Sequence, residues 1–287
     1  MEKNLDKNMP IGLLDSGLGG LTVLREAMRI MPHEDFIYFG DSANAPYGTK
    51  PREEIRKYTF EAAKYLVDRG IKGLAVACNT ATGAAVADLR LMYPDLPLVG
   101  IEPAIKPAVE RNKGGRILVM ATPMTILQDK FKHLLSLYEG KAEIVSVPCE
   151  GLMEFVENGT LSGVNLDEYF TDKITPFLTP DTESIVLGCT HYPFLKGDLS
   201  NFLKGRNIEL IDGSFGTARE LARRINEKGL LKNADAQYLA KVAASKDGSD
   251  LSHEPVFTYY DGFLEIINSS DDPGKTDLCR ELLDIPF

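Results

Sequence analysis

Short apolar runs alternate with amphipathic stretches along most of the chain. The runs at residues 74–77 and 185–188 each end just before a cysteine. Continuous runs of this kind are typical of strands that are buried on both faces of a parallel sheet. Further strands are predicted at residues 11–14, 36–39, 96–101, 117–120, 143–147 and 209–211.

The stretches between these runs carry apolar residues at helical spacing. Leu21, Leu24, Met28 and Met31 form one stripe, and Pro32 ends it. Further helices are predicted at residues 51–70, 81–92, 125–138, 152–156, 166–177 and 217–228. Because strands and helices alternate, the pattern predicts an α/β fold with mainly parallel sheets and right-handed crossovers.

The alternation of strands and helices is interrupted at residues 102–107, where Pro103 and Pro107 break both the strand period and the helix period. Two prolines so close together predict a hinge, and we place a domain boundary there. The cysteine-bearing runs recur in similar contexts, which indicates two pseudo-symmetric halves. From Lys232 onward, turn-forming residues dominate, and this part is interpreted as loop-rich with weak strands.

Composition narrows the class of protein. A chain of 287 residues with 44% apolar and 26% charged residues is long enough for two globular domains. The net charge of −10 argues against a nucleic-acid partner, because no basic field would hold a phosphate backbone. No apolar run approaches the ~20 residues that span a bilayer. The polar first residues give no export signal, so we expect a cytoplasmic protein with reduced cysteines and no membrane partner.

Two of the four cysteines stand in a context that suggests chemistry. Cys78 and Cys189 each follow a predicted strand and precede groups that bind anions. Because ligands bind beyond the carboxyl ends of parallel strands, the two thiols are expected on either side of one ligand. Cys149 and Cys279 lack this context and are interpreted as small buried apolar side chains.

Three interpretations of these thiols remain open. A nucleophilic Cys189 with His191 as its base leaves Cys78 without a role. A zinc site made of Cys78, Cys189 and His191 lacks the usual ligand spacing. A thiolate and a thiol on opposite faces of one carbon could invert that carbon without a cofactor, since thiols can be tuned to act as acid or base near neutral pH.

Neighbouring polar groups suit a zwitterionic ligand. Asp15 could pair with an ammonium group, whereas hydroxyls, amides and turn N–H groups could hold a carboxylate. The groups considered are Asp15, Ser16, Asn79, Thr80 and Thr190. Asp15 and Ser16 could instead cap the helix that follows them. The loop containing Asp41, Ser42, Pro46, Tyr47 and Gly48 could simply be a structured turn.

Four motifs, in order across roughly residues 10–220, resemble the glutamate racemases of the cofactor-independent aspartate/glutamate racemase family. They are Asp15-Ser16-Gly17 with Gly19-Gly20, Gly40-Asp41-Ser42 with Pro46-Tyr47-Gly48-Thr49, Cys78-Asn79-Thr80-Ala81, and Gly188-Cys189-Thr190-His191-Tyr192-Pro193. The resemblance implies catalytic roles for five residues. Cys78 and Cys189 would exchange the α-proton, and Asp15, His191 and Glu157 would assist the thiols.

The resemblance also implies a substrate site, a fold and a biological role. The implied substrate-binding residues are Asp15, Ser16, Asp41, Ser42, Pro46, Tyr47, Gly48, Asn79, Thr80, Thr122, Thr190 and His191. Two α/β domains would enclose the site, one made of residues 1–102 plus 216–287 and the other of residues 103–215. The activity expected is cofactor-free racemisation of glutamate by a homodimer, supplying D-glutamate for peptidoglycan.

Two competing functions are weighed against this expectation. An aspartate racemase would share the two thiols and differ in the reach of its substrate's distal carboxylate. A non-catalytic two-domain amino-acid binder would share the hinge and the crevice but would not need two thiols at strand ends.

Overall fold

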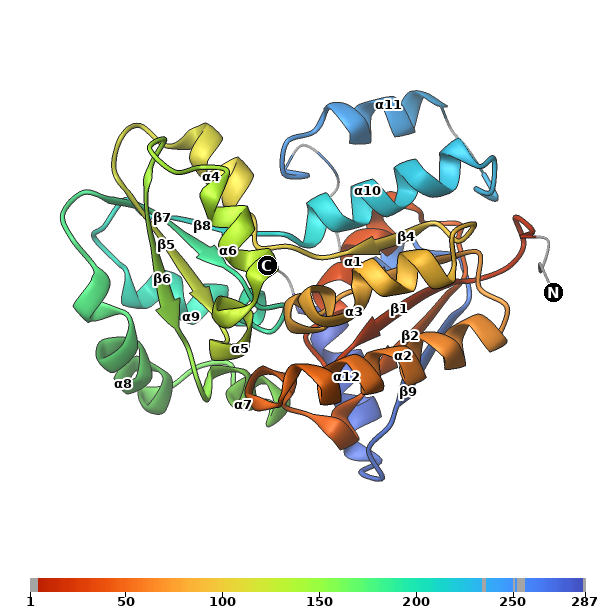
Figure 1. Ribbon diagram of the computed structural model, residues 1–287, viewed down its shortest axis with the longest axis horizontal. Coiled ribbons are helices and arrows are strands. Elements are labelled where there is room, and N and C mark those ends of the chain that lie inside the picture. The colour runs from red at the N-terminus through yellow and green to blue at the C-terminus, as the bar shows by residue number, and fades with distance from the viewer. Residues whose placement is uncertain (1–4, 234–235, 250, 252–255, 286–287) are drawn as a thin grey trace.

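The computed structural model describes residues 5–233, 236–249, 251 and 256–285. Two sheets, each with only parallel strand pairs in this part of the chain, lie side by side with helices around them (Figure 1). The prediction of an α/β fold with mainly parallel sheets is therefore confirmed.

The first sheet has the order β4-β3-β1-β2-β9, and the second has the order β6-β5-β7-β8. The strands of the first sheet are β1 (Ile11–Asp15), β2 (Phe36–Gly40), β3 (Gly73–Val76), β4 (Leu98–Gly100) and β9 (Leu264–Asn268). Those of the second are β5 (Arg116–Ala121), β6 (Glu143–Pro148), β7 (Thr182–Leu187) and β8 (Glu209–Asp212).

Helices connect these strands. The α-helices are α1 (Leu21–Ile30), α2 (Arg52–Asp68), α3 (Asn79–Met92), α4 (Ile105–Arg111), α5 (Pro123–Leu127), α6 (Asp129–Ser136), α7 (Leu152–Glu157), α8 (Val164–Lys173), α9 (Lys196–Phe202), α10 (Ser214–Glu227), α11 (Ala236–Ala244) and α12 (Gly274–Asp284). The 3-10 helices are η1 (Ser42–Asn44), η2 (Tyr47–Thr49), η3 (Thr175–Phe177), η4 (Tyr192–Leu195) and η5 (Val256–Thr258).

The two sheets repeat one strand order. The first four strands run 4-3-1-2, and the second four run 8-7-5-6, so that β3 corresponds to β7 and β1 to β5. The connections diverge between β1 and β3 and again between β5 and β7. Ligands of parallel sheets bind at such switch points, beyond the carboxyl ends of the strands. The recurrence seen in the sequence thus corresponds to equivalent strands, β3 and β7.

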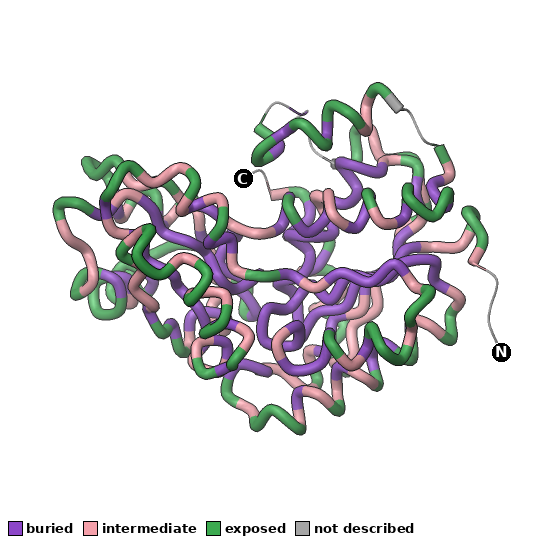
Figure 2. The backbone as a smooth tube through the Cα atoms, turned by 45° about the horizontal axis from the view of Figure 1, so that its top comes forward, coloured by how far each residue is buried: buried purple, intermediate pink, exposed green. Residues whose placement is uncertain are grey.

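Burial explains why the central strands were recognisable. All five residues of β1 and all four of β3 are buried. Figure 2 shows buried positions along both sheets and exposed positions on the outward faces of the surrounding helices. One cluster of buried side chains includes residues of both sheets, among them Leu13, Leu118 and Leu187. The two halves therefore share a packed core.

Three parts of the chain differ from the sequence-based expectation. The helix expected up to Tyr138 is divided into α5 and α6, because Gln128 adopts an extended conformation between them. In the expected hinge, Pro107 lies in the first turn of α4, where the missing N–H costs no hydrogen bond. The domain boundary placed there stays a prediction.

The largest difference is in the tail, where the expectation of loops with weak strands is wrong for two segments. The tail forms the helices α11 and α12, and β9 adds a parallel edge strand beside β2 (Figure 1). The helix α12 buries Cys279, Leu282 and Leu283. These three apolar positions are spaced for one helix face, but the adjacent run of turn-forming residues, 269–274, concealed that pattern.

Among the residues that the structure describes, no helix combines the length and apolar character needed to cross a membrane.

Candidate active site

Both thiols lie just beyond the carboxyl ends of equivalent strands. Cys78 follows β3 and is the N-cap residue of α3, and its Sγ accepts a hydrogen bond from the Ala81 N–H at 3.4 Å. Cys189 follows β7 after a single glycine. Only 6% of Cys78 and 8% of Cys189 is exposed. Both sulfurs are therefore largely shielded from bulk water.

The surroundings of Cys78 favour its neutral form. Its thiol donates to Ser16 Oγ at 3.5 Å. Burial and the nearby Asp15 carboxylate raise the pKa of Cys78 to about 12, while the hydrogen bonds to Ser16 and Ala81 oppose this shift. The neutral thiol is therefore the favoured form of Cys78 near neutral pH.

Asp15 links the two halves of the site. Its Oδ2 accepts from the Gly17 N–H at 2.9 Å, and its Oδ1 accepts from Thr190 Oγ1 at 3.3 Å. Burial raises the pKa of Asp15, although His191 and the N–H groups of Gly17 and Gly20 oppose this. The carboxylate thus lies between the turn that precedes α1 and the turn that follows β7.

Helix capping does not account for Asp15 or Ser16. The N-cap of α1 is Gly20, so neither Asp15 nor Ser16 occupies the capping position. The capping alternative considered from the sequence is therefore wrong. Asp15 instead braces the glycine turn and contacts Thr190.

The surroundings of Cys189 are cationic. His191 Nδ1 lies 3.6 Å from Cys189 Sγ, and His191 Nε2 lies 2.8 Å from Glu157 Oε1. The Gly19 N–H is also 3.2 Å from Nε2. One ring nitrogen cannot donate to the carboxylate and accept from an N–H at once. We assign a proton to Nε2 because the carboxylate is the stronger partner.

The pKa directions agree with that assignment. Burial by itself lowers the pKa of His191, but the hydrogen bonds to Cys189 and Glu157 outweigh burial and raise the pKa well above its usual value. Burial raises the pKa of Glu157, yet the hydrogen bond and charge of His191, with the Leu18 N–H, lower it to about 2. His191 and Glu157 therefore form an imidazolium–carboxylate pair.

The glycine turn after β1 is needed for close approach. A Cβ atom on Gly17 would lie 2.1 Å from Glu157 Oε1, and one on Gly19 would lie 2.4 Å from His191 Nδ1. Any larger side chain would therefore displace Glu157 or His191. Glycine at these two positions lets side chains of the second half reach the first.

A second contact between the halves involves threonines. Thr80 Oγ1 lies 3.1 Å from Thr122 Oγ1 and 3.0 Å from Thr125 Oγ1. A Cβ atom on Gly48 would lie 2.8 Å from the Cβ of Thr122. The structure thus brings together Thr80 and Gly48, which belong to two separate motifs, and Thr122, which lies in neither.

The loop that begins at Asp41 is held by its own residues and by the tail. Asp41 accepts from Tyr47 Oη at 2.6 Å and from Ser269 Oγ at 2.8 Å. Ser42 Oγ accepts from Asn268 Nδ2 at 2.9 Å. The side chains of Asp41 and Ser42 therefore support a structured turn, which was the alternative considered for them. Within this loop Tyr47 and Gly48 are buried, and Pro46 is half-buried.

Asn79 offers an unused acceptor next to Cys78. It is 7% exposed. No donor among the described residues reaches its buried Oδ1. Buried polar atoms are normally paired, so this oxygen is available to a ligand's donor group.

No signal in the sequence pointed to Lys275. Its Nζ lies 3.2 Å from Glu157 Oε2 and also donates to the Glu157 carbonyl. Lys275 belongs to α12, in the tail that was interpreted as loops. No local signal could have found this contact, because 118 residues separate the two partners.

Comparison with known proteins identifies the family. Residues 21–220 match the Asp/Glu/Hydantoin racemase family. The chain belongs to this family.

Its relatives carry a more specific name. The glutamate racemase of Clostridium botulinum (strain Alaska E43 / Type E3) is 50% identical over 97% of this chain and 98% of its own. That of Clostridium novyi (strain NT) is 50% identical over 84% of this chain and 93% of its own. The crystal structure of glutamate racemase from Francisella tularensis in complex with D-glutamate has a TM-score of 0.77 at 27% identity, covering 98% of this chain and 96% of that one.

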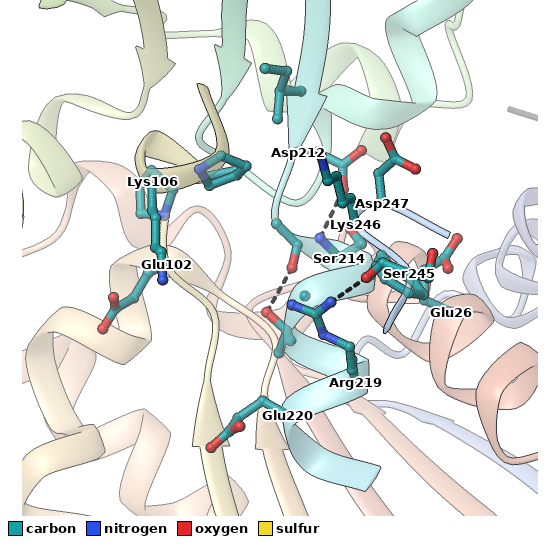
Figure 3. A pocket seen from close by; sticks show the side chains of 18 of the residues that line it. Glu26, Glu102, Lys106, Asp212, Ser214, Arg219, Glu220, Ser245, Lys246 and Asp247 are labelled. Carbon is teal, nitrogen blue, oxygen red and sulfur yellow. Dashed lines mark hydrogen bonds between the residues drawn. The ribbon is translucent and has the colours of Figure 1, made fainter. Parts of the chain in front are cut away.

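This racemase family member also has a cavity of about 1030 Å³ away from the thiols. Acidic and basic side chains from α1, α4, β8 and α10 surround it (Figure 3). None of the site residues predicted from the sequence, all of which the structure describes, is among the residues lining it. In the described ranges, no three His, Cys, Asp or Glu side chains are grouped so that they could hold a metal ion.

Proposed function

We propose that the protein interconverts L- and D-glutamate by moving the α-proton between Cys78 and Cys189. The observation that carries this proposal is the pair of buried thiols at equivalent strand ends, one beside a carboxylate and the other beside an imidazolium. Glutamate as the substrate is supported by relatives named glutamate racemase at 50% identity.

The side chains around the two sulfurs suggest the protonation state of each thiol before the reaction. The His191 cation compensates negative charge on Cys189, whereas burial and Asp15 disfavour it on Cys78. With one enantiomer, the Cys189 thiolate removes the α-proton, and the Cys78 thiol delivers its proton to the opposite face of the carbon. One C–H bond breaks, one forms, and the charge moves from Cys189 to Cys78.

The mirror-image reaction starts from the state that this step leaves. The Cys78 thiolate is then stabilised by the Ser16 hydroxyl and by the Ala81 N–H at the start of α3. It removes the α-proton of the other enantiomer, and Cys189 returns its own. Each thiol thus serves as base in one direction and as acid in the other.

The neighbouring polar groups fit the amino-acid part of the substrate. Asp15 and the unused Oδ1 of Asn79 are acceptors for the ammonium group. Hydroxyl and turn N–H donors are available to the α-carboxylate, where they would stabilise charge that develops on deprotonation. From the resemblance, we assign Ser16, Asp41, Ser42, Pro46, Tyr47, Gly48, Thr80, Thr122, Thr190 and His191 to the substrate site.

A racemisation assay tests the proposal. Purified protein is exhaustively treated with a chelator and incubated with L-glutamate, without pyridoxal phosphate, metal or nucleotide. We expect optical rotation to decay to zero, and we expect aspartate to react far more slowly under the same conditions. Absence of glutamate racemisation, or a loss on chelation that zinc restores, would contradict the mechanism.

We also propose, from the family resemblance, that the product supplies peptidoglycan synthesis in the cytoplasm and that the protein acts as a homodimer. The proposed domains are residues 1–102 plus 216–287 and residues 103–215. The pairing of β9 with β2 supports assigning the C-terminal segment to the first of these.

A further inference from the structure

Glu157 is held from two sides. Its Oε1 faces His191 Nε2 at 2.8 Å, and its Oε2 faces Lys275 Nζ at 3.2 Å. The side chains of Lys275 and Glu157 are 19% and 10% exposed. An ion pair with this little exposure is weakly screened by water and salt.

Lys275 also contacts the backbone at the end of α7. Glu157 is the last residue of α7, and the Lys275 ammonium donates to its carbonyl as well as to its carboxylate. A cation at a helix C-terminus is favourable, because the helix dipole and the unpaired carbonyls are negative there. Lys275 therefore fixes both the backbone and the side chain of Glu157.

Packing in turn fixes the position of Lys275. It is the second residue of α12, whose Cys279, Leu282 and Leu283 are buried. The Lys275 N–H donates to the Asp272 carbonyl at 3.2 Å, which anchors the start of the helix. The ammonium thus projects from the first turn of a helix that is packed into the core.

We propose that Lys275 is a positioning residue for the Cys189 half of the site. By holding Glu157 against His191, it keeps the imidazolium directed at the Cys189 sulfur. This inference rests on the proposed function, because it needs Cys189 to exchange a proton. It gives the C-terminal helix a part in catalysis that no motif in the tail reveals.

The charged and titratable groups that face Glu157 come from several elements. His191 approaches from the turn after β7, and Lys275 and Cys279 approach from α12. Asp15 and Tyr38 approach from the first sheet, and each has a pKa that the Glu157 charge raises. Among these groups of the described residues, two cations lower the pKa of Glu157, namely His191 and Lys275. Removing the ammonium therefore raises the pKa of Glu157.

Three variants test the proposal in the full-length protein. Lys275→Met removes the charge and keeps most of the apolar stem, and Lys275→Arg restores a cation. Arg280→Met is the matched control, because Arg280 lies on the same helix with a 68% exposed side chain. Because the ammonium contacts both the carboxylate and the carbonyl of Glu157, we expect kcat/KM for glutamate to fall roughly tenfold or more in Lys275→Met, which corresponds to about 1.4 kcal/mol or more. Lys275→Arg should recover most of that loss, and Arg280→Met should match wild type.

Two further readings separate positioning from a structural role. The acid limb of the kcat profile should move to higher pH in Lys275→Met and not in Arg280→Met. In a double-mutant cycle, Lys275→Met should have little further effect when Glu157→Gln is already present. Three results would overturn the proposal: losses of kcat/KM that multiply in the double variant, no recovery of kcat/KM in Lys275→Arg, or an acid limb that does not move in Lys275→Met. An inactive wild-type protein would instead refute the proposed function.

Discussion

Cys78 and Cys189 follow equivalent strands, but the side chains around their sulfurs are not equivalent. The sulfur of Cys78 lies near the Ser16 hydroxyl, the N-terminus of α3 and the Asp15 carboxylate, and the pKa of this thiol is raised to about 12. Cys189 has His191, which is backed by Glu157 and then by Lys275. A repeated backbone pattern therefore does not require repeated chemistry. What repeats is the placement of a thiol at a switch point, whereas the side chains around each sulfur differ.

This asymmetry suits a reaction whose two directions start from mirror-image substrates. The proposed mechanism needs the two thiols in unlike protonation states, and the side chains around the two sulfurs are unlike. The equilibrium constant between enantiomers is unity, so kcat/KM must be the same in both directions for any variant. A change confined to one thiol therefore shows itself in kcat, KM or isotope effects with C2-deuterated enantiomers.

Replacing either thiol should have the largest effect. Cys78→Ala and Cys189→Ala each remove the acid from one face, so we expect kcat/KM for racemisation to fall by about 10³-fold or more. Cys149→Ala and Cys279→Ala alter buried thiols outside the proposed pair and should keep their turnover. The measurement is circular dichroism of glutamate from either enantiomer. Near-normal turnover by Cys78→Ala or Cys189→Ala would rule out the two-thiol mechanism.

Asp15→Asn should have the next largest effect. Asparagine keeps an oxygen acceptor for the Gly17 N–H but loses the charge that we propose pairs with the substrate ammonium. Losing one buried charged partner costs on the order of 2–5 kcal/mol, so we expect kcat/KM to fall roughly 10²-fold with little change in Tm. Kinetics and thermal melts of the same preparation decide the matter. A large fall in Tm with normal kcat/KM would make Asp15 a structural residue.

Glu157→Gln should have the smallest effect, visible in the pH dependence of stability. The pKa of Glu157 lies at about 2 in the folded protein against a usual 4.5. A depressed pKa contributes stability above the unfolded value, and that stability is lost as pH falls toward the folded value. Between about pH 5 and pH 3, the free energy of unfolding of wild type should therefore fall ~2 kcal/mol more than that of Glu157→Gln.

Urea titrations at the two pH values give this difference directly. Asp198→Asn is a suitable comparison, because the pKa of Asp198 is raised by burial and its contribution has the opposite sign. Parallel curves for wild type and Glu157→Gln would mean that the imidazolium–carboxylate pair does not form, and the contrast between the two thiols would then disappear.

The strands and the two thiols could be predicted because the necessary signals are local. A strand buried on both faces is a continuous apolar run, and Cys78 and Cys189 directly follow such runs. His191 could be assigned to Cys189 because only two residues separate them. Conversely, α12 was missed because only Cys279, Leu282 and Leu283 mark its buried face, and because a run of turn-forming residues lies shortly before them.

The sequence by itself determined the α/β class, the order of the first eight strands along the chain, and which cysteines follow buried strands. Only the tertiary structure decided that Glu157 faces His191, that Lys275 reaches Glu157, and that Ser269 holds Asp41. The partners in the second and third of these pairs are 118 and 228 residues apart. Periodicity reports which face of an element is buried, but it carries no information about which distant side chain lies opposite. The surroundings of Cys189 include those distant partners, through the contacts of Glu157 with His191 and of Lys275 with Glu157, and they are therefore a property of the folded chain.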